Sequence, residues 1–338
     1  MANDLQESTA DLAAKQRLLD EIRKTELGRY LLDDLARRNV TLVVSSNMSA
    51  VNQGSGEAGA YWDPKARRIV VSPDRSLAKQ LHYFAHETRH SAQFDVDMAF
   101  PRPTEVLHPV NFVLSNRLHE MDADAFAVYF VADHALKTKS KFFEELSQPE
   151  QAEHWLSSLL GTEGKISRAQ MYTTFIDSWR ENGKDLARAM RDAAVTLFNE
   201  PQINKYYDER CVMLWNKNIF PVFAKASKKP RSQDAKRVRQ FFHDFRDGKF
   251  QSPQDNLEAH AKAYSKIFAE GGSPDYLAPV AAKVFHYLAE DAEGAQDIWR
   301  NQMPDMKERF NEARDFFCKK TARKKSSPAP SRAPKAAA

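Results

Sequence analysis

The most constraining feature of this sequence is the stretch from Arg75 to Ala99, which contains neither glycine nor proline. Because nothing in it interrupts a helical hydrogen-bond ladder, a continuous helix is expected from about residue 75 to 97. His82, His86 and His90 recur at four-residue steps, so they fall on one face of such a helix. The predicted helix therefore carries a stripe of three imidazoles.

Within this stripe, residues 86–90 have the spacing HExxH. Both imidazoles can reach a single ion from one helical face, and zinc accepts nitrogen ligands in a tetrahedral shell that keeps one position for water. Glu87, beside His86, can take the proton of that water and pass it to a leaving amine. The sequence thus predicts a Zn²⁺ cofactor, His86 and His90 as metal ligands, and Glu87 as catalytic base. His82 is interpreted as a wall of the site, with a fallback role as ligand.

A third protein ligand is expected on the next long helix, from about 110 to 136, which begins near Pro109. Glu120 and Asp124 lie one turn apart on it, in an otherwise apolar environment. Glu120 can complete the zinc shell, and Asp124 can hold a ligand imidazole through its other nitrogen. Asp124 or His119 as third ligand are the alternatives.

These motifs resemble those of the gluzincin metallopeptidases, in particular a minimal bacterial type with a short strand unit, an HExxH helix and a second helix that supplies Glu. The resemblance covers roughly residues 40–136 and includes His86-Glu87-x-x-His90-x-x-Gln93 and Glu120-x-x-Ala123-Asp124. It implies a zinc-dependent hydrolase of the metalloendopeptidase type, with Glu87 as general base and Glu120 as zinc ligand.

The expected fold class is α+β and predominantly helical, since the chain has only 11 glycines and is rich in helix-forming residues. Short β-branched runs predict strands at about 40–44, 58–62 and 67–72, the last two joined by a turn at Asp63-Pro64. The strand at 67–72 is a candidate edge for pairing with an extended peptide. Gly28 is a candidate break in the first helical segment.

Four regions are expected along the chain. Residues 1–38 form N-terminal helices, 39–140 a metallopeptidase-like core, 141–320 a helical region and 321–338 a disordered basic tail. Helices of the third region are expected at about 141–160, 167–198, 201–217, 234–246, 254–269, 274–289 and 303–319. Tyr206, Tyr207 and Arg210 in this region are candidate oxyanion stabilisers.

The charge and the cysteine content limit which partners and which cellular compartment are expected. The net charge of +4 comes from the basic C-terminal residues, so nucleic-acid binding is not expected beyond weak contacts by that tail. The two cysteines and the lack of a signal or membrane segment predict a cytoplasmic protein without membrane association. The expected partner is a peptide or protein substrate.

Other classes of function remain compatible with the sequence. The HExxH domain can be a non-proteolytic metal-binding sensor, or the chain can be a helical interaction module. A di-iron carboxylate bundle, suggested by Glu105-x-x-His108, is disfavoured because Pro101, Pro103 and Pro109 surround that motif.

Overall fold

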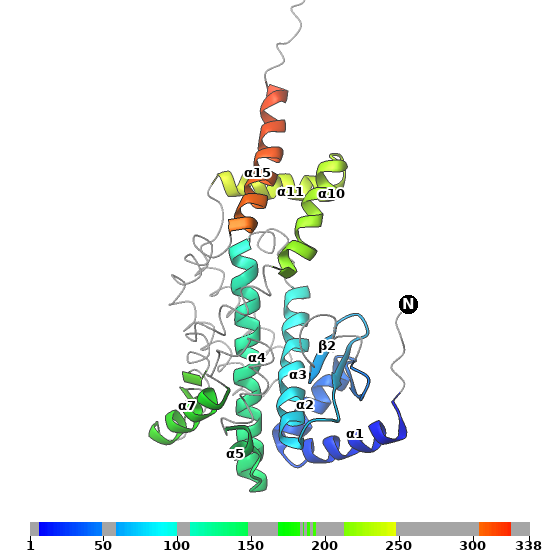
Figure 1. The fold of residues 1–338 in the computed structure, drawn as a ribbon, viewed down its shortest axis with the longest axis vertical. Coiled ribbons are helices and arrows are strands. Elements are labelled where there is room, and N and C mark those ends of the chain that lie inside the picture. The colour runs from blue at the N-terminus through cyan, green and yellow to red at the C-terminus, as the bar shows by residue number, and fades with distance from the viewer. Residues whose placement is uncertain are drawn as a thin grey trace, which may run out of the picture. The chain divides into compact units, whose positions relative to one another are not determined.

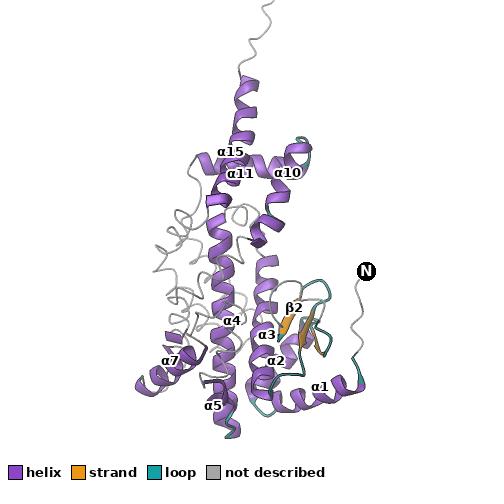
Figure 2. Cartoon of the chain, viewed as in Figure 1, coloured by secondary structure: helices purple, strands orange, loops and turns teal. Residues whose placement is uncertain are grey.

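The computed structural model describes a mostly helical chain with one small sheet (Figures 1 and 2). The described residues are 7–48, 59–99, 109–147, 168–182, 185, 188–189, 192–193, 213–247 and 304–325. They divide into two compact units. The first holds Met1–Pro101, Val113–Glu209 and Pro253–Ala292, and the second holds Arg102–Phe112, Arg210–Ser252 and Glu293–Ala338. The expected α+β, predominantly helical class is confirmed.

The first unit begins with two helices, α1 (Thr9–Ile22) and α2 (Glu26–Arg37). The Ser8 side chain accepts a hydrogen bond from the amide of Asp11, whose carboxylate accepts one from the Ser8 amide, so α1 starts with a capping box. The break between the helices lies before Thr25, which caps α2, and not at Gly28 as expected. A Cβ on Gly28 would lie 1.8 Å from the carbonyl oxygen of Ile22, so glycine is needed there for close approach of the two segments.

Three strands form a sheet with the order β1-β3-β2: β1 (Thr41–Val44), β2 (Ala60–Asp63) and β3 (Arg68–Val71). β1 pairs with β3 in parallel, and β2 with β3 antiparallel. Asp63 Oδ1 accepts hydrogen bonds from the amides of Lys65 and Ala66, which fixes the turn that sequence chemistry predicted. The prediction that the 67–72 strand is an edge is wrong, because β3 is the central strand. It pairs with β1 on one side and with β2 on the other, so neither side has free backbone groups to pair with a peptide.

The sheet packs on α3 (Leu77–Ala99), the helix that carries the HExxH motif, and α3 lies beside α4 (Pro109–Thr138) (Figure 1). Trp62 of β2 meets Phe94 of α3 edge-on with ring centroids 6.2 Å apart. On the other side, Phe84 contacts Phe130 of α4 at 5.9 Å, and both rings are fully buried. Apolar burial on both sides fixes the rotation of α3, and therefore the direction in which its histidine stripe points.

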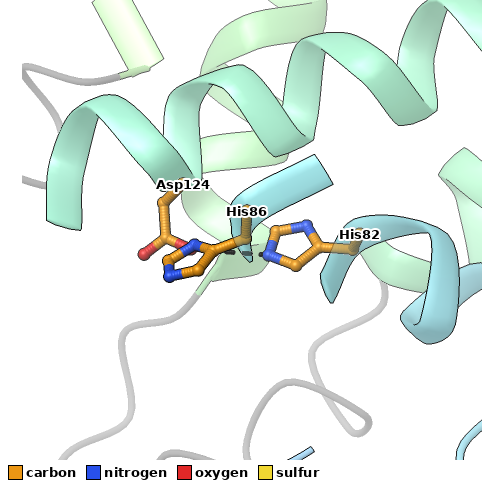
Figure 3. A group of neighbouring side chains, drawn as sticks. All are labelled: His82, His86 and Asp124. Carbon is orange, nitrogen blue, oxygen red and sulfur yellow. Dashed lines mark ion pairs between the residues drawn. The ribbon is translucent and has the colours of Figure 1, made fainter. Parts of the chain in front are cut away.

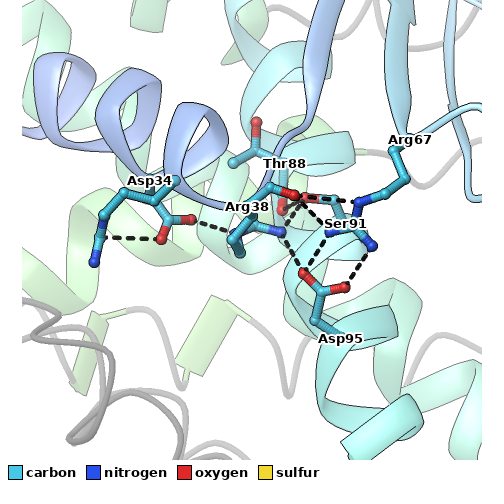
Figure 4. A network of polar contacts seen from close by, with 7 residues as sticks. Asp34, Arg38, Arg67, Thr88, Ser91 and Asp95 are labelled. Atoms are coloured by element: carbon cyan, nitrogen blue, oxygen red, sulfur yellow. Dashed lines mark hydrogen bonds and ion pairs between the residues drawn. The ribbon is translucent and has the colours of Figure 1, made fainter.

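A polar network ties the end of α2 and the turn before β3 to α3 (Figure 4). Asp95 of α3 accepts hydrogen bonds from the guanidinium groups of Arg38 and Arg67, and Arg38 also donates to Ser91 Oγ. Arg67 has a left-handed backbone with φ of 48°, and its guanidinium donates to the carbonyl oxygen of Arg38. These contacts hold the sheet against α3 at the end of the helix beyond His90.

Two further helices belong to the first unit, α5 (Phe142–Ser147) and α7 (Arg168–Glu181), which pack together through Phe143 and Phe175. Buried His134 of α4 contacts the carbonyl oxygen of Glu21 through Nε2 at 3.1 Å, and thereby links α4 to the end of α1. Within the first unit, hydrophobic packing and this polar contact hold the helices around α4.

The second unit contains α10 (Phe220–Lys228), α11 (Gln233–Arg246) and α15 (Pro304–Lys325). Its core is a cluster of buried aromatic rings: Trp215, Phe223, Phe241, Phe242, Phe310 and Phe317. The sequence predicts no helix at 220–228, yet Pro221 is accommodated in α10 because the first turn of a helix needs no amide donor. α15 continues to Lys325, past the expected start of the tail at 321.

No helix in the described parts of the chain has the length and apolarity to cross a membrane. The helices expected at 254–269 and 274–289 lie outside the described residues, as do most of those expected at 141–160 and 201–217.

Candidate metal centre

The imidazoles of α3 face α4, and successive histidines along α3 contact carboxylates that lie progressively earlier in α4. His82 meets Asp124, His86 meets both Asp124 and Glu120, and His90 meets Glu120. As the residue number rises on α3, it falls on α4, so the helices are antiparallel. The one-turn spacing on each helix therefore sets histidines against carboxylates over successive turns.

Three side-chain atoms converge where a metal could bind. Glu120 Oε2 lies 3.5 Å from Nε2 of His86 and 3.4 Å from Nε2 of His90, and the two nitrogens are 2.9 Å apart. Bonds of about 2.0–2.1 Å in a tetrahedral zinc shell set ligand atoms about 3.3–3.4 Å apart. The two distances from Glu120 Oε2 match this spacing, whereas the two nitrogens lie closer together than it, so the two rings must move slightly apart to bind one tetrahedral ion with a fourth position left open.

Asp124 lies behind the first histidine. Its Oδ1 is 3.0 Å from Nδ1 of His86 and 3.4 Å from Nε2 of His82, and all three side chains are buried (Figure 3). Asp124 thus faces Nδ1 of His86, whereas Glu120 faces Nε2 of the same ring. This is the arrangement of a carboxylate that orients a metal-binding imidazole rather than one that shares its metal.

His82, His86 and Asp124 form a second group whose ligand atoms lie close together. His86 can use Nδ1 toward this group only if the same ring bridges two ions, because its Nε2 faces Glu120 and His90. Ion pairs of both rings with the Asp124 carboxylate account for the contacts without a second ion. His82 therefore lies in the wall of the site, beside Asp124.

The carboxylates change the titration of the imidazoles. Burial lowers the pKa of His86, but the facing Asp124 carboxylate, with Glu120 and Glu87, outweighs burial and raises this pKa to about 10. Burial also lowers the pKa of His90, and Glu120 outweighs it, so this pKa is raised as well. Burial raises the pKa of Glu120, yet the charges of His90 and His86 hold it well below its usual value. The carboxylates therefore favour positive charge at this position, as a cation site requires.

Glu87 is buried on the same helix, and its carboxylate contributes to the raised pKa of both His86 and His90. The role of Glu87 as general base stays a prediction.

The sequence predicts no role for Gln93, although the residue stands three positions after His90 in the motif. The structure places Gln93 Oε1 2.7 Å from Nδ1 of His90. Its position one turn after a ligand was the available signal, because side chains three residues apart share a helical face.

Other residues predicted from the sequence lie away from the converging ligand atoms or outside the described residues. His119, an alternative third ligand, does not join the converging ligand atoms, and its backbone oxygen accepts a hydrogen bond from Gln93. The candidate oxyanion stabilisers Tyr206, Tyr207 and Arg210 lie outside the described residues. So do both residues of the di-iron alternative, Glu105 and His108.

A family model described as "Putative metallopeptidase family (DUF6782)" matches residues 2–218, well over half of the chain. The chain belongs to this family. The match includes the sheet, α3 and α4, so the metallopeptidase family description covers the site just described. No curated protein and no solved structure matches the chain. Membership in DUF6782 supports metal-dependent peptidase chemistry at a coarse level.

Proposed function

We propose that this DUF6782 protein is a zinc-dependent, gluzincin-like metallopeptidase that hydrolyses peptide bonds. The observation that carries the proposal is the position of Glu120 Oε2, within 3.5 Å of Nε2 of both HExxH histidines. A surface helix with two chance histidines gives no reason for a carboxylate from another helix to meet both rings. Zinc fits the mixed nitrogen and oxygen donor set and the distances of Glu120 Oε2 from the two nitrogens.

The chemistry divides among the side chains. His86, His90 and Glu120 would hold the ion, which when bound lowers the pKa of a coordinated water and polarises the peptide carbonyl. Glu87 takes the proton of the attacking water on its carboxylate and delivers it to the nitrogen of the leaving amine. Asp124 accepts a hydrogen bond from Nδ1 of His86, which keeps the Nε2 lone pair of that ring directed at the ion.

The test separates metal binding from catalysis. Zinc content and cleavage of an unfolded protein substrate are measured for the parent, His86→Ala and Glu87→Gln. We expect His86→Ala to lose zinc, and Glu87→Gln to keep it while cleavage falls by about 10²–10⁴-fold, the usual contribution of a general base. Glu26→Gln, the same change at an exposed position in α2, is the control and should alter neither property.

Each contrary outcome has a definite meaning. Equal cleavage by Glu87→Gln and the parent would exclude Glu87 as the base. A parent protein that holds no zinc would show that the site is misassigned. If the parent holds zinc but cleaves no member of a broad peptide library, the protein is a metal-binding sensor instead of a peptidase.

A further inference from the structure

Gln93 makes three polar contacts from a fully enclosed position on α3, where its exposed fraction is 2%. Its Oε1 lies 2.7 Å from Nδ1 of His90. Its Nε2 donates to the backbone oxygen of His119 at 2.9 Å and to Oδ2 of Asp122 at 2.9 Å. One amide thus connects a metal-site imidazole to two acceptors on α4.

The two acceptors fix the orientation of the Gln93 amide. A backbone carbonyl cannot donate a hydrogen bond, so the group that faces the His119 oxygen must be the NH₂. Exchange of the amide oxygen and nitrogen would set an oxygen against two acceptors inside a buried site and leave buried polar groups without hydrogen bonds, which is destabilising. Oε1 therefore points at His90.

Asp122 is held as an acceptor by an arginine. Arg89 Nε and Nη2 donate to Oδ2 and Oδ1 of Asp122 at 2.6 and 3.0 Å, and both side chains are buried. The guanidinium is always charged, and it also lies over the ring of Phe126 with its carbon 5.2 Å from the centroid. A two-point pair of this kind fixes the direction of the carboxylate.

We propose that Gln93 is the positioning residue of His90, and that the pair Arg89–Asp122 sets the direction in which Gln93 acts. Because Oε1 can only accept, Nδ1 of His90 carries the hydrogen, and Nε2 is left to present its lone pair toward Glu120 and His86. His90 is thus oriented by a neutral amide, whereas the carboxylate of Asp124 orients His86. This inference rests on the proposed zinc site.

The experiment compares zinc affinity in Gln93→Met and Gln93→Glu with that of the parent full-length protein, by competition with a chromophoric chelator. Methionine keeps the length and fills the space but supplies no strong acceptor. Glutamate restores an acceptor for the Nδ1 hydrogen of His90, although it brings an oxygen next to Asp122. We expect Gln93→Met to weaken zinc binding by about 10–100-fold, and Gln93→Glu to weaken it less.

A packing role predicts the reverse order. If Gln93 only fills space between α3 and α4, the apolar methionine should be tolerated better than a buried glutamate beside Asp122. An affinity for zinc in Gln93→Met that equals or exceeds that in Gln93→Glu would overturn the inference. The absorption spectrum of the cobalt-substituted proteins gives a second readout, because it changes with ligand geometry and not with stability alone.

Gln80 provides a matched control on the same helix. It is also buried, and its Nε2 donates to the backbone oxygens of Arg75 and Pro73 at 2.6 and 3.4 Å, near the start of α3. Gln80→Met should lower stability without changing zinc affinity or the cobalt spectrum. Since zinc alone is the probe, the result does not depend on peptidase activity. Failure of the parent to bind zinc would refute the proposed function, whereas the wrong order of variants refutes only the role of Gln93.

Discussion

Oδ1 of Asp124 lies 3.0 Å from Nδ1 of His86, whereas Glu120 approaches Nε2 of the same ring at 3.5 Å. The imidazole is held between two carboxylates that are one turn apart on α4. One carboxylate faces the proposed metal position, and the other faces away from it. An acidic pair at this spacing can therefore contact both ring nitrogens of a single histidine.

Asp124→Asn should weaken zinc binding by about 10–100-fold, because it removes the charge that orients His86 while it retains the shape of the side chain. Asp133→Asn on the same helix is the control, since Asp133 pairs with Lys137 away from the site. Chelator competition measures both variants. Unchanged zinc affinity in Asp124→Asn would exclude its role as the support of His86.

Zinc binding should release protons at neutral pH. Zinc binds only neutral imidazole, whereas the metal-free pKa of His86 is raised to about 10 and that of His90 is also raised. We therefore expect at least one proton released per zinc at pH 7, and an affinity that falls as the pH falls. Calorimetry in two buffers of different ionisation enthalpy measures this number. Identical binding enthalpies in the two buffers would contradict the prediction.

His134 should make the folded state sensitive to acid. Burial lowers its pKa from the usual 6.5, so below about pH 6.5 the unfolded chain binds a proton that the folded protein does not. Stability is then full above 6.5 and falls as the pH drops from there toward the lowered pKa. The difference in unfolding free energy between the parent and His134→Gln, measured by denaturant at pH 7.5 and 5.5, should shift in favour of the variant at pH 5.5. A difference independent of pH would show that His134 does not titrate on unfolding.

The sequence predicted the parts of this protein that depend on local chemistry. The α3 helix follows from the absence of glycine and proline, and the β2–β3 hairpin follows from Asp63 and its turn. The parallel pairing of β1 with β3 did not follow, because alternation of side chains does not reveal which strands are neighbours. This is why the 67–72 strand was wrongly expected to be an edge.

In the site too, the sequence predicts what depends on local spacing but not the contacts between helices. The spacing of His86 and His90 predicts that they share a helical face, and the structure brings Glu120 to them from another helix. The role of Gln93 depends on its contacts with α4, at Asp122 and the His119 carbonyl, which no local pattern contains. Similarly, α10 was missed because the effect of Pro221 depends on whether it falls in the first turn or in the interior of a helix.

The buried Arg89–Asp122 pair should be costly to break on one side and much less costly to replace as a whole. Asp122→Ala leaves the Arg89 charge buried without its partner, so we expect a loss of about 3–5 kcal/mol in the free energy of unfolding. Arg89→Met combined with Asp122→Leu removes both charges and should recover much of that loss. The exposed pair Arg23–Asp20 is the comparison, since its removal by Asp20→Ala should cost at most about 1 kcal/mol. Denaturant unfolding measures all three proteins, and a double variant that is less stable than Asp122→Ala would show that the pair contributes more than compensation of two buried charges.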